Sequence, residues 1–283
     1  MNSLIDLHIH STASDGTDSV EMILTQLIDA GIHTFAITDH DTILGSLAME
    51  HLVPAQLHFL RGIEFSCITS YKKCHILGYN FDSNDVVFQD ALKLGKDLRQ
   101  EKMQKRITFL REEFGIVFTE EELSWLYAQE SPGKPAFAQL LINQGLASDI
   151  DLAIQKYINP CKTKNDRIHG RTAIQAIRLA GGISIWAHPL GGEGEKRLTK
   201  EEFARQLDEL ISYGIQGLEC YYSRYSQDEI AFLTEQAAAH NLLISGGSDY
   251  HGSNKKNITL GKLNQEQIPI DPQSLTLLGQ LIP

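Results

Sequence analysis

The sequence predicts an α/β fold, with parallel strands and helices closed or nearly closed into a barrel that carries a helical insertion. Short apolar runs of β-type composition alternate with helical stretches in the first and last thirds of the chain. Glycines follow several helical stretches, where helices commonly stop. Between about residues 84 and 166 this alternation gives way to helical periodicity alone.

Seven apolar runs are expected to form strands. They are Leu4 to His10, Thr34 to Asp39, His58 to Glu64, Cys74 to Tyr79, Gly182 to His188, Gln216 to Tyr221 and Leu242 to Asp249. Three helices are predicted to end before glycines: Val20 to Ala30, Arg171 to Ala180 and Lys200 to Tyr213. The repeated order of strand, helix and glycine predicts parallel βα units, and seven units favour a barrel, although the strand count alone leaves an open sheet as the alternative.

The stretch from Asn84 to about Asp166 contains no convincing strand. Its clearest pattern is the apolar stripe of an amphipathic helix, formed by Met103, Ile107, Leu110 and Phe114. We therefore expect residues 1–84 and 166–283 to form the barrel and residues 85–165 an inserted α-helical subdomain. A simple elongated crossover is the alternative, but about eighty residues exceed an ordinary connection.

Composition excludes several classes of protein. The 283 residues carry 25 Lys and Arg against 36 Asp and Glu, a net charge of −11, which argues against wrapping of a nucleic-acid backbone. The four cysteines form no C-x-x-C pair, so neither a disulfide framework nor a thiolate zinc site is implied. No signal-peptide pattern is visible and no apolar run approaches the roughly 20 residues of a membrane span, so we expect a cytoplasmic protein without a membrane partner.

Metal-ligand residue types recur at the ends of the predicted strands. His8 and His10 alternate with apolar residues, so both point to one face of the first strand. Others follow in Thr38-Asp39-His40-Asp41, Gly62-Ile63-Glu64, Ala187-His188-Pro189 and Ser248-Asp249-Tyr250-His251. Because strand ends of a βα barrel meet at one rim, these groups should converge on a divalent metal. His75, early in its strand, fits least well, and a histidine satisfied by core hydrogen bonds is the alternative at any single position.

These motifs, in this order, resemble the PHP (polymerase and histidinol phosphatase) family. The resemblance rests on His8-x-His10 with Ser14-Asp15-Gly16, the blocks around His40, Glu64, His188 and Asp249, and His75-Ile76-Leu77-Gly78-Tyr79. It is strongest to the stand-alone bacterial metal-dependent phosphoesterases, which include 3′,5′-nucleoside bisphosphate phosphatases and a 5′→3′ exoribonuclease. The resemblance implies a distorted (β/α)7 TIM-like barrel with such an insertion.

The resemblance also implies two to three divalent ions. One would be held by His8, His10, Glu64 and Asp249, a second by Asp15, His40 and His251, and a third by Glu64, His75 and His188, with Glu64 bridging. Mn²⁺ is favoured by family habit, and Fe²⁺ or Zn²⁺ also suits this donor set. Catalysis would depend on Glu64, Asp249 and His188, with a metal-bridging hydroxide attacking phosphorus. Asp39 would either accept a ligand imidazole N–H or cap a strand end.

The implied substrate is a small nucleotide-like phosphoester, either a 3′,5′-nucleoside bisphosphate or a short RNA or DNA oligonucleotide, and no obligate protein partner is implied. The chain departs from the usual sequence pattern of these stand-alone bacterial phosphoesterases in two segments, Lys134-Pro135-Ala136 and Tyr221-Tyr222-Ser223-Arg224-Tyr225. Residues expected to bind substrate are Arg99, Arg106, Lys134, Ser223 and Tyr225, although a solvated basic helix is the alternative for the first two. Glu219 is interpreted as structural rather than as a ligand.

Three other functions compete with this one. A histidinol-phosphate phosphatase is the first. The second is an amidohydrolase-type enzyme that cleaves C–N bonds, which shares the H-x-H pattern. The third is a non-catalytic PHP domain, against which the complete set of nine ligand positions argues.

Overall fold

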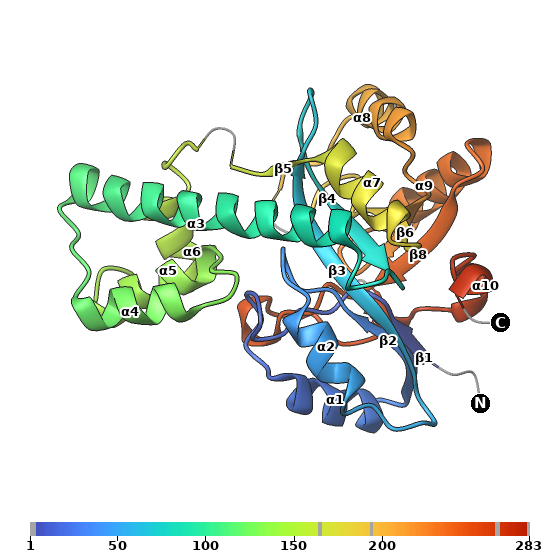
Figure 1. Ribbon diagram of the computed structural model, residues 1–283, viewed down its shortest axis with the longest axis horizontal. Coiled ribbons are helices and arrows are strands. Elements are labelled where there is room, and N and C mark those ends of the chain that lie inside the picture. Colours follow the sequence, from blue (N-terminus) through green and yellow to red (C-terminus); the bar gives the residue numbers. More distant parts are fainter. Residues whose placement is uncertain (1–3, 164–165, 193–194, 264–266, 282–283) are drawn as a thin grey trace.

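The computed structural model describes residues 4–163, 166–192, 195–263 and 267–281. Seven strands follow one another in a sheet that curves into a barrel: β1 (Leu4–Asp6), β2 (Ile32–Ile37), β3 (His58–Ile68), β4 (Lys73–Tyr79), β6 (Ile183–Ala187), β7 (Gly217–Tyr222) and β8 (Leu243–Gly247). A short strand, β5 (Ile168–His169), pairs with β3 off this path. The predicted α/β barrel is confirmed (Figure 1).

The barrel closes between its first and last strands. The backbone N–H of Asp249 donates to the carbonyl of His8 at 2.8 Å, and that of His10 donates to the carbonyl of Tyr250 at 2.9 Å. A parallel bridge joins Ile9 to Tyr250. These bonds lie just beyond the last residues of β1 and β8, so the closure itself brings the first and last histidine motifs together.

The expectation that every strand is parallel is wrong for β4. This strand runs antiparallel to both neighbours, β3 and β6. It follows β3 through a tight turn in which Thr69 N donates to Lys72 O at 2.9 Å, and so short a link can only reverse the chain. The start of β4 therefore lies beside the carboxyl ends of β3 and β6, with His75 opposite Ser66 and Ala187. The early position of His75 in its strand is thereby explained.

Helices cover the outside of the barrel. They are α1 (Val20–Asp29), α2 (Leu44–Glu50), α7 (Gly170–Leu179), α8 (Lys200–Tyr213) and α9 (Gln227–Ala239). Capping boxes begin α8 at Thr199 and α9 at Ser226. Gly31, Gly181 and Gly214 each follow a helix and have a positive φ, which is typical of a glycine that ends a helix. The predicted helix ends at these glycines are therefore observed. The chain ends in β9 (Lys262–Leu263), β10 (Ile268–Pro269) and α10 (Leu278–Leu281).

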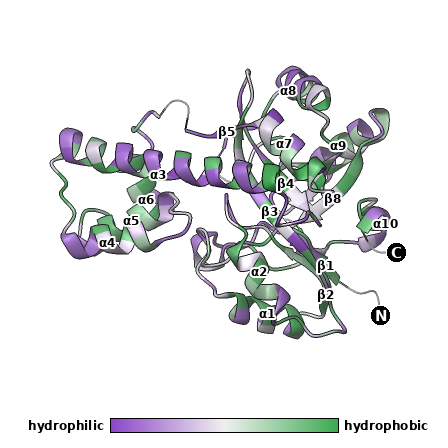
Figure 2. Ribbon diagram, viewed as in Figure 1, coloured by the Kyte–Doolittle hydropathy of each residue, from purple (hydrophilic) through white to green (hydrophobic). Residues whose placement is uncertain are grey.

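The insertion is helical and has its own core. It contains α3 (Val86–Phe114), α4 (Glu120–Ala128), α5 (Lys134–Asn143), α6 (Ile150–Ala153) and a π-helical turn, Ile154–Ile158. In the predicted stripe, Met103 and Leu110 are buried, whereas Phe114 is 39% exposed. The first turns of α3 join the barrel core through Phe88, and its second half extends beyond the barrel over α4 to α6 (Figures 1 and 2). The buried apolar residues of the insertion thus form a second hydrophobic cluster.

Within the described residues, no helix is long and apolar enough to cross a membrane.

Candidate metal centre

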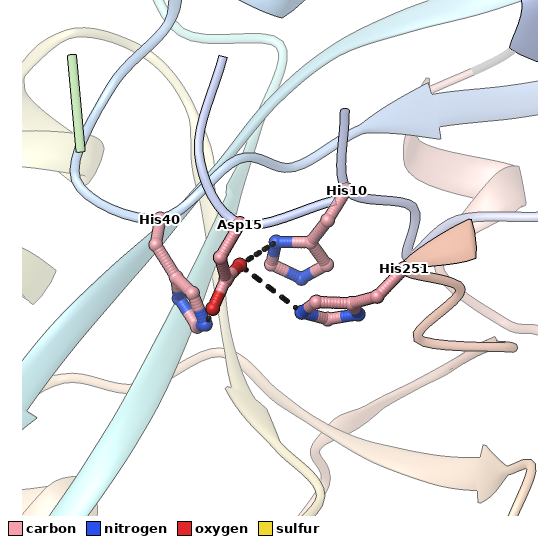
Figure 3. A group of neighbouring side chains, drawn as sticks. All are labelled: His10, Asp15, His40 and His251. Atoms are coloured by element: carbon pink, nitrogen blue, oxygen red, sulfur yellow. Dashed lines mark ion pairs between the residues drawn. The ribbon is translucent and has the colours of Figure 1, made fainter. Parts of the chain in front are cut away.

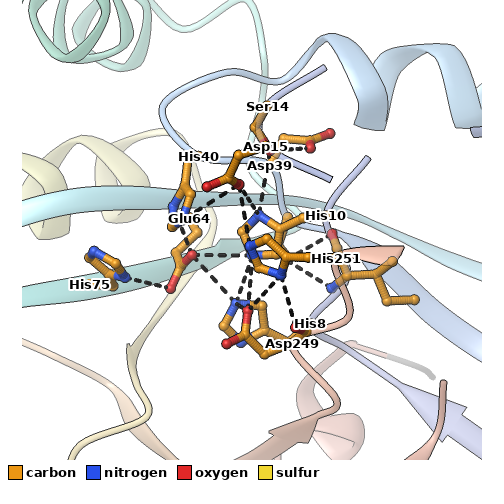
Figure 4. Close-up of polar contacts among 12 residues, drawn as sticks. His8, His10, Ser14, Asp15, Asp39, His40, Glu64, His75, Asp249 and His251 are labelled. Carbon is orange, nitrogen blue, oxygen red and sulfur yellow. Dashed lines mark hydrogen bonds and ion pairs between the residues drawn. The ribbon is translucent and has the colours of Figure 1, made fainter. Parts of the chain in front are cut away.

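The nine predicted ligands lie together at one end of the barrel: Figure 4 labels eight of them, and the ninth, His188, lies 3.2 Å from Glu64 and 3.3 Å from His75. The loops after β1, β2, β6 and β8 supply seven of them, and β3 and β4 supply the other two: His8, His10, Asp15, His40, His188, Asp249 and His251 from loops, Glu64 and His75 from strands. The predicted shared face of the first motif is confirmed, because the Nε2 atoms of His8 and His10 are 3.1 Å apart. Their apolar neighbours Leu7 and Ile9 are fully buried, which fixes this orientation.

Glu64 is at the centre of the cluster, with its side chain 1% exposed. Its Oε2 atom lies 2.9 Å from His40 Nδ1, 3.3 Å from His10 Nε2 and 3.5 Å from His8 Nε2. Its Oε1 atom lies 3.1 Å from His75 Nδ1 and 3.2 Å from His188 Nε2. One carboxylate therefore faces five imidazoles, which is an arrangement suited to bridging cations.

Two aspartates complete the cluster. Asp15 Oδ1 lies 3.2 Å from His251 Nε2 and 3.9 Å from both His10 Nδ1 and His40 Nε2 (Figure 3). Asp249 Oδ1 lies 3.4 Å from His8 Nε2 and from His10 Nε2. The other Asp249 oxygen accepts from Tyr222 OH at 3.1 Å and pairs with the ammonium of Lys255. Each aspartate thus directs one oxygen at the histidines.

The donor set fits divalent metal ions. Three groups of donor atoms lie close enough to share an ion: His10, Asp15, His40 and His251; His8, His10 and Asp249; and His40, Glu64 and His75. In the part of the chain that the structure describes, Asp15 Oδ1 and Glu64 Oε2 are buried without a hydrogen-bond partner. Burial favours the neutral acids, but the surrounding imidazoles hold the pKa of both carboxyls well below its usual range. Buried anionic oxygens among imidazoles, without thiolate, match Mn²⁺, Fe²⁺ or Zn²⁺.

These groups overlap with the predicted ion positions and differ from them in membership. His10 belongs to two groups, and His40 joins Glu64 and His75 where the resemblance implies His188. His188 Nε2 is nevertheless 3.3 Å from His75 Nδ1 and 3.2 Å from Glu64, at the same edge of the cluster.

One interpretation of the sequence expected Asp39 to accept a ligand imidazole N–H, but within the described residues its carboxylate makes no hydrogen bond to a histidine ring. Its carboxylate accepts from Ser11 N at 2.8 Å, Ser11 Oγ at 2.7 Å and Ser14 Oγ at 2.6 Å. Ser14 Oγ lies 3.5 Å from His10 Nδ1. Asp39 therefore fixes the loop after β1, which agrees with the alternative of a polar group that caps a strand end.

The five predicted substrate-binding residues have different environments. Arg99 pairs with Asp41, Arg106 is buried with its guanidinium 5.7 Å from the Phe137 ring centroid, and Lys134 Nζ donates to Asn159 Oδ1 at 2.8 Å. Ser223 and Tyr225 are buried, and Tyr225 OH accepts from Leu190 N at 2.7 Å. Ser223 and Tyr225 are thus placed beneath the surface, and Tyr225 contacts the loop after β6 through Leu190.

A cationic cavity adjoins the cluster, and sequence reasoning missed its central residue. The cavity has a volume of about 310 Å³, and its lining includes His75, His188, Lys73, Lys196 and Arg167. Within the described residues, the buried Nε and Nη1 atoms of Arg167 have no hydrogen-bond partner. The only sequence signal was an isolated arginine before the short strand at Ile168, which no motif distinguished.

Comparison with known proteins gives the family, because the PHP domain family matches residues 6–211. The chain belongs to the PHP family. This PHP protein is 30% identical to a 5′-3′ exoribonuclease of Haemophilus influenzae, over 89% of the chain and 91% of the relative. It is 28% identical to a 3′,5′-nucleoside bisphosphate phosphatase of Chromobacterium violaceum, over 87% of each protein.

The solved structures agree with this result. The structure of an amidohydrolase from Chromobacterium violaceum with bound sulfate matches the PHP protein with a TM-score of 0.80 and 25% identity, over 95% of this chain and 94% of that one. The PHP protein is a metal-dependent phosphoesterase.

Proposed function

We propose that the PHP protein releases phosphate from a small nucleotide-like phosphoester, a 3′,5′-nucleoside bisphosphate or a short oligonucleotide. The observation that carries this proposal is the position of the Arg167 cavity directly beside His75 and His188, so that an anion-binding pocket adjoins the metal-binding cluster. The names of the curated relatives, a bisphosphate phosphatase and an exoribonuclease, support the same substrate class.

The nine ligand residues would hold two to three divalent ions, with Mn²⁺ favoured. The chemistry that such ions supply when bound is charge neutralisation at the phosphoryl group and a lowered pKa of water. The residues of the chain position these ions and the substrate. Glu64 and Asp249 would supply carboxylate oxygens to these ions beside the histidine rings, and Lys255 adds an ammonium group at the edge of the cluster.

The cavity would bind the part of the substrate that does not react. The Nε and Nη1 atoms of Arg167 have no hydrogen-bond partner among the described residues, and a guanidinium can bind a phosphate through two parallel hydrogen bonds. Lys73 and Lys196 are exposed on the same lining and add positive charge. Lys134 and Arg106 of the insertion would extend the positive electrostatic potential of the cavity toward a longer substrate. An acidic protein would thus present a locally cationic pocket to a phosphorylated ligand.

Phosphate release by the Mn²⁺-loaded protein tests the proposal. The substrates are adenosine 3′,5′-bisphosphate, a short 5′-phosphorylated RNA, histidinol phosphate, an aryl phosphate and an amide panel. We expect the bisphosphate or the RNA to give the highest kcat/KM. The Glu64→Gln protein, purified in parallel, controls for contaminating phosphatases. Preference for histidinol phosphate or cleavage of amides would contradict the proposal, and inactivity on all substrates would favour a non-catalytic domain.

A further inference from the structure

Glu219 of β7 is a buried carboxylate with both of its oxygens in use. Its Oε1 atom accepts from His8 Nδ1 at 2.7 Å, and its Oε2 atom accepts from the backbone N–H of His188 at 2.7 Å. The side chains of Glu219 and His8 are 0% exposed. One side chain therefore joins two predicted ligands that are 180 residues apart in the sequence.

Local backbone geometry directs Glu219 to this place. The pairing of β7 with β8 shifts register between Glu219 and Tyr221, and such a bulge changes the direction of the side chain beside it. The partner on the other side is also unusual, because His188 has a φ of 30°, a region that residues with a side chain rarely adopt. Backbone of this kind persists where surrounding contacts hold it, and the bond to Glu219 is such a contact.

Both histidine rings turn toward the same carboxylate. A neutral His8 ring that donates through Nδ1 has its lone pair on Nε2, as a metal ligand needs, and this Nε2 atom lies 3.5 Å from Glu64 Oε2. His188 Nε2 lies 3.2 Å from Glu64 Oε1. The two rings are nearly parallel, with centroids 6.0 Å apart and an interplanar angle of 17°.

We propose that Glu219 is a positioning residue that orients His8 and His188 toward the two oxygens of Glu64 and so couples the ion positions that these ligands share. The inference rests on the metal centre of the proposed function. Glu219 binds its two partners at once, so its loss affects both ion positions together. The group of Asp15, His40 and His251 makes no hydrogen bond to Glu219 within the described residues, so retention of an ion by this group should not change when Glu219 is replaced.

Glu219→Gln tests this inference because the amide is nearly isosteric and has one acceptor oxygen. It can serve either His8 or His188, and its NH2 group then faces the other donor. We expect about 10- to 100-fold weaker retention of the coupled ions in chelator competition, the usual effect of losing such a partner. In the Zn²⁺-loaded, ¹⁵N-histidine-labelled protein, the slowly exchanging His8 Nδ1 proton should be lost or shifted.

Asp6→Asn is the matched control. Asp6 is also fully buried, and its carboxylate accepts from the backbone N–H groups of Ser248, Gly261 and His8, with no hydrogen bond to a histidine ring within the described residues. We expect a comparable loss of thermal stability, unchanged metal retention and an unchanged His8 ring signal. Glu219→Asp, which keeps the charge but cannot span both partners, should fall between Gln and wild type.

The outcomes separate the inference from the proposed function. Wild-type metal retention and an unchanged His8 proton in Glu219→Gln would overturn the inference, as would equal metal loss in Asp6→Asn. If Glu219→Gln does not fold, wild-type metal retention by Glu219→Asp would overturn it in the same way. A wild-type protein that binds no divalent ion would instead contradict the metal centre itself.

Discussion

Arg99 of helix α3 donates through Nε to Asp41 Oδ2 at 2.9 Å, and its Nη2 atom donates to the same oxygen and to Ser66 Oγ. Asp41 directly follows His40, and its other oxygen accepts from Ser66 N at 2.8 Å, just beyond Glu64. The contact therefore ties the insertion to two strand ends that carry predicted ligands. Arg99 has an anchoring contact where the sequence suggested a substrate contact.

Arg99→Gln should destabilise the protein by about 3 kcal/mol, because it leaves the buried Asp41 carboxylate without its partner. We expect a nucleoside bisphosphate and an aryl phosphate to lose kcat/KM in equal proportion, since the ligand His40 loses its support. Denaturant unfolding and steady-state kinetics measure the two effects. Arg111→Gln, on an exposed turn of the same helix, is the control and should change neither. A loss confined to the bisphosphate would restore the predicted substrate contact.

Unlike Arg99→Gln, Arg167→Gln should lower kcat/KM for the bisphosphate much more than for the aryl phosphate. If its guanidinium binds the phosphate that does not react, the bisphosphate loses about 10- to 100-fold in kcat/KM, the value of one or two charged hydrogen bonds, while the aryl phosphate changes little. Kinetics on the two substrates give the ratio. Arg171→Gln is the matched control, because Arg171 is exposed and its guanidinium lies 4.7 Å from the ring centroid of Tyr213. Equal losses on both substrates would assign Arg167 a structural role.

Removal of divalent ions should abolish phosphate release. We expect elemental analysis to find two to three ions per chain, and dialysis against a chelator followed by Mn²⁺ to remove and restore activity. Glu64→Gln should remain folded, with a circular dichroism spectrum like that of wild type, and should lose activity by orders of magnitude. Activity that is indifferent to chelator, or wild-type turnover in the Glu64→Gln protein, would contradict the centre.

Lys102 should make stability depend on pH. Burial and the guanidinium groups of Arg167 and Arg106 lower its pKa to about 7, although Asp166 Oδ2, at 2.7 Å, acts in the opposite direction. The folded protein therefore binds fewer protons here than the unfolded chain, so stability should rise with pH from about 7 toward the unfolded pKa of 10.5. Urea unfolding at several pH values should show a rise that Lys102→Met lacks. A parallel dependence in both proteins would refute this assignment.

The sequence by itself determined the strand and helix alternation, the helical insertion and the nine candidate ligands. Periodicity places His8 and His10 on one face, and the glycines after the helices mark their ends, because these signals depend on neighbouring residues alone. Strand ends of a barrel share one rim, so ligand residues at the ends of different strands are expected to meet there although they are far apart in the sequence.

Only the tertiary structure decided the direction of β4, the partners of the basic residues and the surroundings of Glu219 and Arg167. Strand direction depends on a short turn that periodicity does not distinguish from a crossover. Whether an arginine binds substrate or a neighbouring carboxylate depends on which side chain folding brings within hydrogen-bond distance, as Asp41 is brought to Arg99. In the sequence, Glu219 is indistinguishable from any other residue of its strand. Folding of the barrel brings His8 and His188 to its two carboxylate oxygens.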